Sequence, residues 1–308
     1  MTSLESPFTD TDDYLHRVGE FLRERDLLVL VLRSGAQYRG VDLHGCQAER
    51  RHNARRNVDV GRHGRRAWQL PFYENFSALK LPTVEGNVLS IPTGATIEVI
   101  DSGMVYGLRY DDRKRIDVDL TFRGLEQPVP LRHGTPPYPA ASHYDQIGHV
   151  TGHVLLDGER IAVDCYAMRD RSWGARTERG YGRVGYTWLG DRECSLLTYS
   201  APTATSDDIH SGYLRRGEEV TSVVAGDRKL VRNNIHSWVE TLEISVVDES
   251  GTEVAATGRA RSRMILPGAT NICINTLLEF EIEGRTVYGE DQDVWSIDLF
   301  RQARSIKP

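Results

Sequence analysis

The sequence predicts a mainly β protein made of two antiparallel β units, with one short helix near the N-terminus. Apolar residues recur with a period of two on both sides of a proline-rich stretch, and tight-turn signals separate many of these runs. Only one segment has the spacing of an amphipathic helix. A chain of 308 residues is also long enough for two domains, each with its own apolar core.

The first half should begin with the helix and continue as strands. Residues 14–22 follow a polar start that can cap a helix, and their apolar side chains recur with helical spacing. Apolar runs at 28–32, 97–100 and 105–110 are typical of strands. Residues 116–123 alternate apolar with polar side chains, which indicates a strand with one face on a core and the other in water.

A proline-rich stretch separates the two halves. The prolines are Pro128, Pro130, Pro136, Pro137 and Pro139. Proline cannot donate a hydrogen bond to a sheet, and it restricts the residue before it to extended conformations. We therefore place a domain boundary here, with residues 1–137 forming the N-terminal β domain and residues 138–308 the C-terminal one.

The second half repeats a hairpin pattern. The expected hairpins are 150–166 around Asp157-Gly158, 239–264 around residues 249–251, and 277–288 around residues 283–285. Many short strands with little helix are typical of antiparallel barrels or sandwiches, whose interiors can hold an apolar ligand. After the last hairpin, we interpret residues 290–293 as a closing turn and residues 295–299 as a final strand.

Charge and hydropathy argue against several classes of partner. The 38 basic and 44 acidic residues give a formal net charge of −6, which is no reason to expect nucleic-acid binding. We interpret the arginine-rich segment 50–66 as an exposed loop, with a surface for an anionic substrate or partner as the alternative. The N-terminus does not resemble a secretory signal and no apolar run has the length of a membrane span, so we expect a cytoplasmic protein.

The sequence carries none of the common cofactor or metal motifs. Cys46, Cys165, Cys194 and Cys273 form no CxxC pair, so we expect reduced cysteines and neither a zinc site nor a disulfide framework. No GxGxxG or phosphate-binding loop precedes a helix, and no Gly-x-Ser-x-Gly motif supports a serine hydrolase. We therefore expect neither a cofactor nor a metal ion.

Residues 164–199 combine aromatic and charged side chains. The stretch contains Asp170, Arg171, Trp173, Tyr186, Trp188 and Tyr199. A pocket lined by indole and phenol rings can stabilise a carbocation, and a desolvated carboxyl with a raised pKa can protonate an alkene. The alternative is structural: Asp170 and Arg171 cap a turn while the tryptophans fill a core.

The same region resembles a known family. Residues 170–174, Asp-Arg-Ser-Trp-Gly, and residues 185–189, Gly-Tyr-Thr-Trp-Leu, are similar to the signature of the carotenoid 1,2-hydratase and AttH-like family, which has an Asp-(His or Arg)-x-Trp-Gly segment. A preceding hairpin with Thr151-Gly152 and Asp157-Gly158 also matches. The chain departs from the pattern at Met168, where a tryptophan commonly stands.

The resemblance implies two lipocalin-like domains of antiparallel barrel or sandwich type, with a pocket in or between them. Members of that family hydrate prenyl chains, catalyse cyclisations or have no assigned activity. We therefore expect a cofactor-independent lyase-type enzyme, a hydratase, dehydratase or cyclase, that acts by acid–base catalysis on a hydrophobic isoprenoid-like or polycyclic small molecule. The alternative is a non-catalytic carrier of such a molecule.

Asp170 is the expected principal acid or base, with His143 or Tyr199 as its helper. His143 begins the second half and could bring a proton donor or acceptor to the domain junction, whereas a hydrogen-bonded linker is the alternative. Trp173, Tyr186 and Trp188 should contribute to one apolar cavity. The expected substrate-binding residues are Arg171, Trp173, Tyr186, Trp188 and Asp145.

Overall fold

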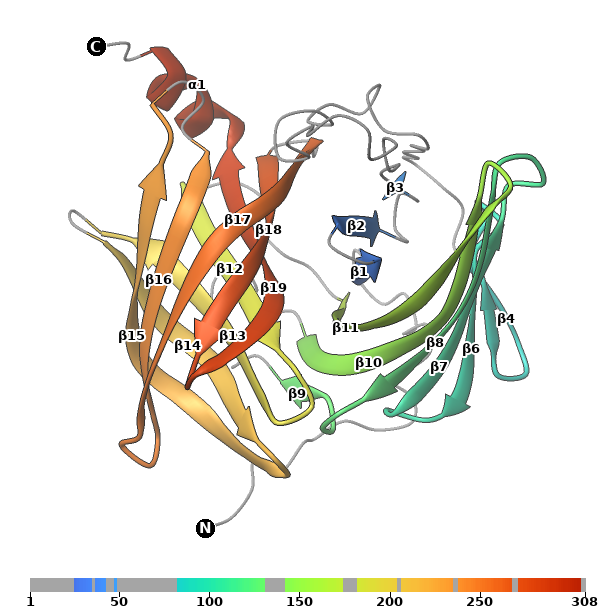
Figure 1. Cartoon of the computed structure of the whole chain (residues 1–308), viewed down its shortest axis with the longest axis horizontal. Helices are drawn as coiled ribbons and strands as arrows, with labels where there is room; N and C mark the ends of the chain where they lie inside the picture. The colour runs from blue at the N-terminus through green and yellow to red at the C-terminus, as the bar shows by residue number, and fades with distance from the viewer. Residues whose placement is uncertain are drawn as a thin grey trace.

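The computed structural model describes residues 25–34, 37–42, 47–48, 82–130, 142–173, 182–203, 206–234, 238–267 and 271–305. These residues form 19 strands and one helix, in two β units that lie side by side (Figure 1). The mainly β, antiparallel fold class predicted from the sequence is therefore confirmed. The N-terminal helix expected at 14–22 and the arginine-rich segment 50–66 lie outside the described residues.

The first unit is an open antiparallel sheet. Its strands are β1 Arg25–Ser34, β2 Gln37–Asp42, β3 Gln47–Ala48, β4 Thr83–Glu85, β5 Val88–Ser90, β6 Thr96–Asp101, β7 Val105–Asp111, β8 Ile116–Gly124, β9 Val129–Pro130, β10 Ser142–Leu156 and β11 Glu159–Trp173. Their order is β3-β2-β1-β11-β10-β8-β7-β6-β5-β4, and β9 pairs with β10 beside this path. The alternation expected at 116–123 is observed, since every second side chain of β8 is buried.

The second unit is a closed barrel. Its strands are β12 Arg183–Gly190, β13 Cys194–Pro202, β14 Asp207–Arg216, β15 Glu219–Arg232, β16 Val239–Asp248, β17 Glu253–Pro267, β18 Asn271–Ile282 and β19 Arg285–Ser296. Consecutive strands pair in antiparallel fashion, and β19 pairs with β12 to close the ring. The three predicted hairpins are the β10–β11, β16–β17 and β18–β19 pairs.

The turn chemistry explains why these hairpins were predictable. At the β10–β11 turn, Asp157 and Gly158 have φ angles of 49° and 82°. Two consecutive residues with positive φ make the tight turn whose twist matches that of the flanking strands, and the Asp-Gly dipeptide tolerates this conformation. Glu283 and Gly284 do the same between β18 and β19, with φ angles of 50° and 74°.

Two expectations near the C-terminus are wrong. Residues 290–293 are not a closing turn but the middle of β19. There they pair with residues of β12 on one side and of β18 on the other, which satisfies their backbone hydrogen-bonding groups. Residues 297–299 do not continue a strand, because the helix α1 covers Ile297–Ser305. The Ser296 hydroxyl accepts a hydrogen bond from the Leu299 backbone N–H at 3.2 Å, and Asp298 lies in the first turn, so this helix starts with ordinary capping chemistry.

The chain passes from sheet to barrel between β11 and β12. Strand β10 follows the proline-rich stretch in the sequence, whereas β8 precedes it, and yet the two strands pair with each other. The division into domains 1–137 and 138–308 stays a prediction, and the topology places the change of sheet further along the chain. No helix among the described residues combines the length and apolar character needed to cross a membrane. Within the same residues, Cys165, Cys194 and Cys273 form no disulfide.

Buried apolar residues form separate clusters inside and between the units. One cluster packs on the first sheet, and a second, the barrel core, includes Leu189, Leu278 and Val287 and fills the barrel interior. A third lies between the two units, and we call it the junction cluster. Its members are Val129, Ile147, Met168, Tyr186, Trp188, Leu197, Tyr199, Tyr213, Val220 and Leu277.

A buried ionic network occupies the barrel interior beside the barrel core. Arg228 binds Asp291 with Nη2–Oδ2 at 2.7 Å, while Arg183 Nε lies 2.6 Å from Asp293 Oδ1. Burial raises the pKa of Asp293, but Arg232, Arg228 and Arg183 outweigh it and hold the pKa at about 2. Asp291 and Asp293 share a face of β19 with Val287 of the barrel core, so this network points inward and the alternate residues point outward.

Candidate active site at the junction of the two units

A polar group from both units lies within the junction cluster. In the β10–β11 hairpin, Asp145 is paired with Asp170, and His143 is two residues before Asp145 on the same face. In the barrel, Tyr186 of β12 is paired with Tyr199 of β13. The sheet thus supplies an imidazole and two carboxyls, and the barrel supplies two phenols that face them.

Asp145 is the centre of the hydrogen bonding. Its Oδ1 accepts from the Tyr186 hydroxyl at 2.6 Å and lies 2.9 Å from His143 Nε2, while its Oδ2 accepts from the Tyr199 hydroxyl at 3.0 Å. Burial, and then the charge of Asp145, raise the pKa of Tyr186 well above its ordinary value of 10. Tyr186 therefore stays protonated and donates its hydroxyl hydrogen to Asp145.

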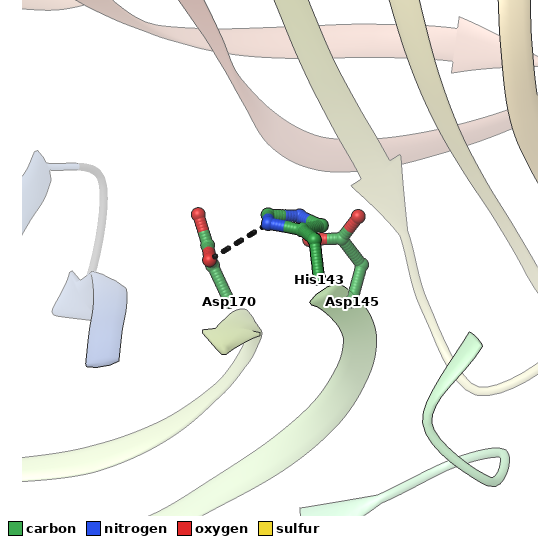
Figure 2. A group of neighbouring side chains, drawn as sticks. All are labelled: His143, Asp145 and Asp170. Atoms are coloured by element: carbon green, nitrogen blue, oxygen red, sulfur yellow. Dashed lines mark hydrogen bonds and ion pairs between the residues drawn. The ribbon is translucent and has the colours of Figure 1, made fainter. Parts of the chain in front are cut away.

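His143 lies between the two carboxyls. Its Nδ1 is 3.5 Å from Asp170 Oδ1 (Figure 2). Its Nε2 contacts Asp145 and also lies 2.7 Å from the Tyr199 hydroxyl. The side chains of His143 and Asp145 are 1% and 3% exposed, whereas that of Asp170 is 14% exposed. Asp170 is therefore the member of this trio most open to a substrate, and His143 connects it to the buried Asp145.

The structure brings five of the eight sequence-predicted site residues together. They are His143, Asp145, Asp170, Tyr186 and Tyr199. Trp188 packs nearby in the junction cluster, with its indole N–H donating to Glu290 Oε2 at 3.4 Å. Arg171 is buried beside Asp170 but, as the next residue on β11, points to the opposite face of the strand. Trp173 ends β11, and its side chain lies outside the described part.

The trio is also a potential ligand set. His143, Asp145 and Asp170 each offer a ligand atom, and these atoms lie within 4.8 Å of one another. One imidazole with two carboxylates is a donor set that divalent metals use in proteins. The 2.9 Å separation of His143 Nε2 from Asp145 Oδ1 is that of an ordinary hydrogen bond, so these two side chains contact each other directly.

Sequence reasoning missed a second buried acid beside this site. Glu126 Oε1 accepts from the Tyr213 hydroxyl at 2.8 Å and from the Ile147 backbone N–H at 2.7 Å, and its Oε2 lies 3.2 Å from Arg215 Nε. Burial raises the pKa of Glu126 to about 7 despite these lowering contacts. Its partners lie 21 and 87 positions away in the sequence, so no local motif could indicate them.

Comparison with protein families identifies the chain. A family model described as a domain of unknown function, DUF7064, matches residues 64–291, which is well over half of its length. The chain belongs to the DUF7064 family. No curated protein matches this DUF7064 chain in sequence.

Solved structures show the same fold as this DUF7064 chain. A protein assigned as AttH (NE1406) from Nitrosomonas europaea has a TM-score of 0.59 at 12% identity, over 96% of this chain and 97% of that one. CghA has a TM-score of 0.58 at 11% identity, over 89% and 88% of the two chains. CghA crystallised with Sch210972 has a TM-score of 0.55 at 10% identity, with the same coverage. These structures confirm the lipocalin-like fold that the resemblance to AttH-like proteins implied.

Proposed function

We propose that this protein is a lyase-type enzyme, a hydratase, dehydratase or cyclase, that moves protons to and from a hydrophobic small molecule at the junction of its two units. The observation that carries the proposal is His143, hydrogen-bonded to Asp145 and facing Asp170, with two tyrosines on the other side. This group combines proton donors and acceptors with an aromatic surround. Such a site performs acid–base chemistry with the chain's own residues.

Asp170 is the group proposed to exchange a proton with substrate. In hydration, the protonated carboxyl of Asp170 gives its proton to one carbon of a C=C bond, which leaves a carbocation on the other carbon. A water oxygen then bonds to the cation and loses a proton, which returns to the Asp170 carboxylate. In cyclisation, a second C=C bond attacks the cation instead, and the product cation loses a proton to the Asp170 carboxylate. Dehydration is the reverse of the first sequence.

His143 and Asp145 are positioning residues in this scheme. Asp145, fixed by both tyrosine hydroxyls, accepts from His143 Nε2 and so orients Nδ1 toward Asp170. An imidazole in this place can take up the proton that is released in the second half of the reaction and pass it to the Asp170 carboxylate. Tyr199, which touches both His143 and Asp145, links the two.

The aromatic residues around the group favour a hydrophobic substrate. Tyr186 and Tyr199 lie against each other with ring centroids 4.6 Å apart and ring planes tilted by 33°, and both belong to the junction cluster with Trp188. Phenol and indole faces stabilise cations. CghA, which shares the fold, crystallised with the small molecule Sch210972. An isoprenoid-like or polycyclic alkene is the substrate class that we propose, with a carrier of the same molecules as the second candidate.

The test begins with a panel of isoprenoid and polycyclic alkenes and alcohols incubated with the protein in ¹⁸O-labelled water. Hydration or its reverse is detected as ¹⁸O gain or loss of water by mass spectrometry, and cyclisation as a new isomer of equal mass. Asp170→Asn keeps the shape but removes the transferable proton, so turnover should fall by ~10² or more.

Asp164→Asn is the matched control. Asp164 lies on the same strand with its side chain 83% exposed, so this variant should turn over like the wild type. A folded Asp170→Asn protein with wild-type turnover would contradict the assignment of the acid. Recovery of every panel member unchanged, with some bound tightly, would favour the carrier.

A further inference from the structure

The outer face of the barrel carries buried amides in line with the two tyrosines. Gln292 of β19 is paired with Tyr186 of β12 on one side and with Asn275 of β18 on the other. Directly paired residues of an antiparallel sheet point to the same face, with Cβ atoms about 5 Å apart. The sheet therefore continues the row Tyr199–Tyr186 with Gln292 and then Asn275.

Alternation along β19 fixes the direction in which Gln292 points. Asp291 and Asp293 on either side are held inside the barrel by Arg228 and Arg183. Gln292 must therefore face outward, as Trp188 and Leu277 of the junction cluster do on the neighbouring strands. Because ion pairs hold both of its neighbours, this position on β19 is rigid.

Gln292 is buried without using its amide donor. Its residue is 8% exposed, and among the described residues its Nε2 has no hydrogen-bond partner. A buried NH₂ group without an acceptor costs free energy, so such a group in a native protein calls for an explanation. The nearby Tyr186 and Tyr199 hydroxyls both donate to Asp145, which leaves the Gln292 amide as an unused donor on this row.

Asn275, the next residue of the row after Gln292, is a second buried amide on the same outer face. It is 5% exposed, and its Oδ1 accepts from the Cys273 thiol at 2.7 Å. This contact occupies the carbonyl oxygen of the Asn275 amide and so orients its NH₂ group. Two amides thus follow the two phenols along one face, and neither amide carries a charge.

We propose that Gln292 is a substrate-binding residue that donates a hydrogen bond to an oxygen of the substrate. The substrate is then a hydrophobic molecule that carries a carbonyl or hydroxyl oxygen in addition to the C=C bond at which Asp170 exchanges a proton. A neutral donor matches a neutral oxygen, because an amide gives a carboxylate no opposite charge. This inference rests on the proposed function for the location of the site, and it adds the polar group by which the substrate is recognised.

Binding without turnover tests the inference. The probes are two ketones, β-ionone and 2-decalone, and the two hydrocarbons in which CH₂ replaces the C=O of each. Dissociation constants are measured by tryptophan fluorescence quenching for the full chain with and without Gln292→Leu. Both measurements are made in the wild-type background and in the Asp170→Asn background. Gln292→Leu should weaken ketone binding by about tenfold and leave hydrocarbon binding within twofold, since only the ketones lose a hydrogen bond.

Thr276→Val is the control. Thr276 is next to Asn275, fully buried, and also has an unpartnered side-chain oxygen, but alternation points it into the barrel. The variant should therefore leave the affinity for both kinds of probe unchanged. The inference is overturned if Gln292→Leu affects ketones and hydrocarbons equally, if neither ketone binds the wild-type chain, or if Thr276→Val reproduces the loss. Selective ketone loss with no turnover of any alkene would support the inference and count against the enzyme.

Discussion

At the scale of single residues, the site depends on pairings that the chain makes over long distances. His143, Asp145, Asp170, Tyr186 and Tyr199 could be named from the sequence because they fall in or near a recognisable stretch. Their mutual contacts could not, since Tyr199 lies 56 positions from His143. Glu126 and Gln292 carry no local signal at all. Each acquires its character from the neighbours that the fold places around it.

Glu126 should make stability depend on pH. Its pKa is about 7 in the folded chain, against an ordinary value of 4.5, so the folded state holds its proton more tightly. The associated stability is complete below about pH 4.5 and is lost as pH rises to 7. A shift of this size corresponds to about 3 kcal/mol.

Glu126→Gln should remove this dependence, because glutamine keeps the acceptor oxygen and never ionises. Urea unfolding between pH 4.5 and 8 measures the effect, and the variant should be the more stable protein at pH 8. Glu219→Gln, at an exposed position, should follow the wild-type curve. If the free energy of unfolding of the wild type changed between pH 4.5 and 7 in the same way as that of Glu126→Gln, the assignment of the raised pKa to Glu126 would be rejected.

At the scale of elements, hairpins were predictable and the C-terminal elements were not. Tight turns such as Asp157-Gly158 are encoded by adjacent residues, so the sequence contains the whole signal. Asp291 and Asp293 looked like a polar turn because their arginine partners lie on other strands. Trp295, Ile297 and Leu299 alternate as in a strand, yet the cap at Ser296 starts a helix.

Strand β12 has a glycine where the ionic network needs space. A Cβ added at Gly185 would come closest to Ser200 Oγ and would lie 2.8 Å from both Cζ and Nη1 of Arg228, whose guanidinium is fixed by Asp291. Gly185→Ala should therefore displace this guanidinium and destabilise the protein by roughly 1–3 kcal/mol.

Gly107→Ala is the comparison for Gly185→Ala. A Cβ at Gly107 would meet its nearest neighbours at 3.5 Å, which is ordinary contact. Denaturant unfolding of both variants should show a loss for Gly185→Ala and little change for Gly107→Ala. Equal stabilities would mean that Arg228 moves without cost.

At the scale of the whole molecule, the two units are joined by a shared core. Ile147 and Met168 of the sheet pack in the junction cluster with Tyr186, Leu197 and Tyr213 of the barrel. The sequence predicted two antiparallel β units but not which strands face each other, because those contacts depend on how one completed sheet packs on another. The position of the site between the units likewise results from this packing and could not be predicted from the sequence.

Ile147→Ala should loosen both units at once. The side chain is fully buried in the junction cluster, so its truncation should cost about 2–5 kcal/mol. Hydrogen exchange should become faster in β10 and β11 and also in β12–β14. Ile244→Ala, inside the barrel core, should increase exchange in the barrel strands alone. If Ile147→Ala made hydrogen exchange faster in the first sheet alone, the two units would not be coupled.

The pairing of β1 with β11 has a consequence for how the protein is made. Strand β1 can pair with β2 on one edge at once, but Arg25 is partnered by Ser172 on the other edge, so β1 leaves the ribosome 147 positions before this second neighbour is synthesised. At about 5–20 residues per second, this strand waits for roughly 7–30 s. Throughout that time the nascent chain presents residues 27–32, an uninterrupted run of leucine and valine, to the crowded cell. Slower growth at low temperature and a chaperone that holds nascent chains should therefore raise the yield of folded protein.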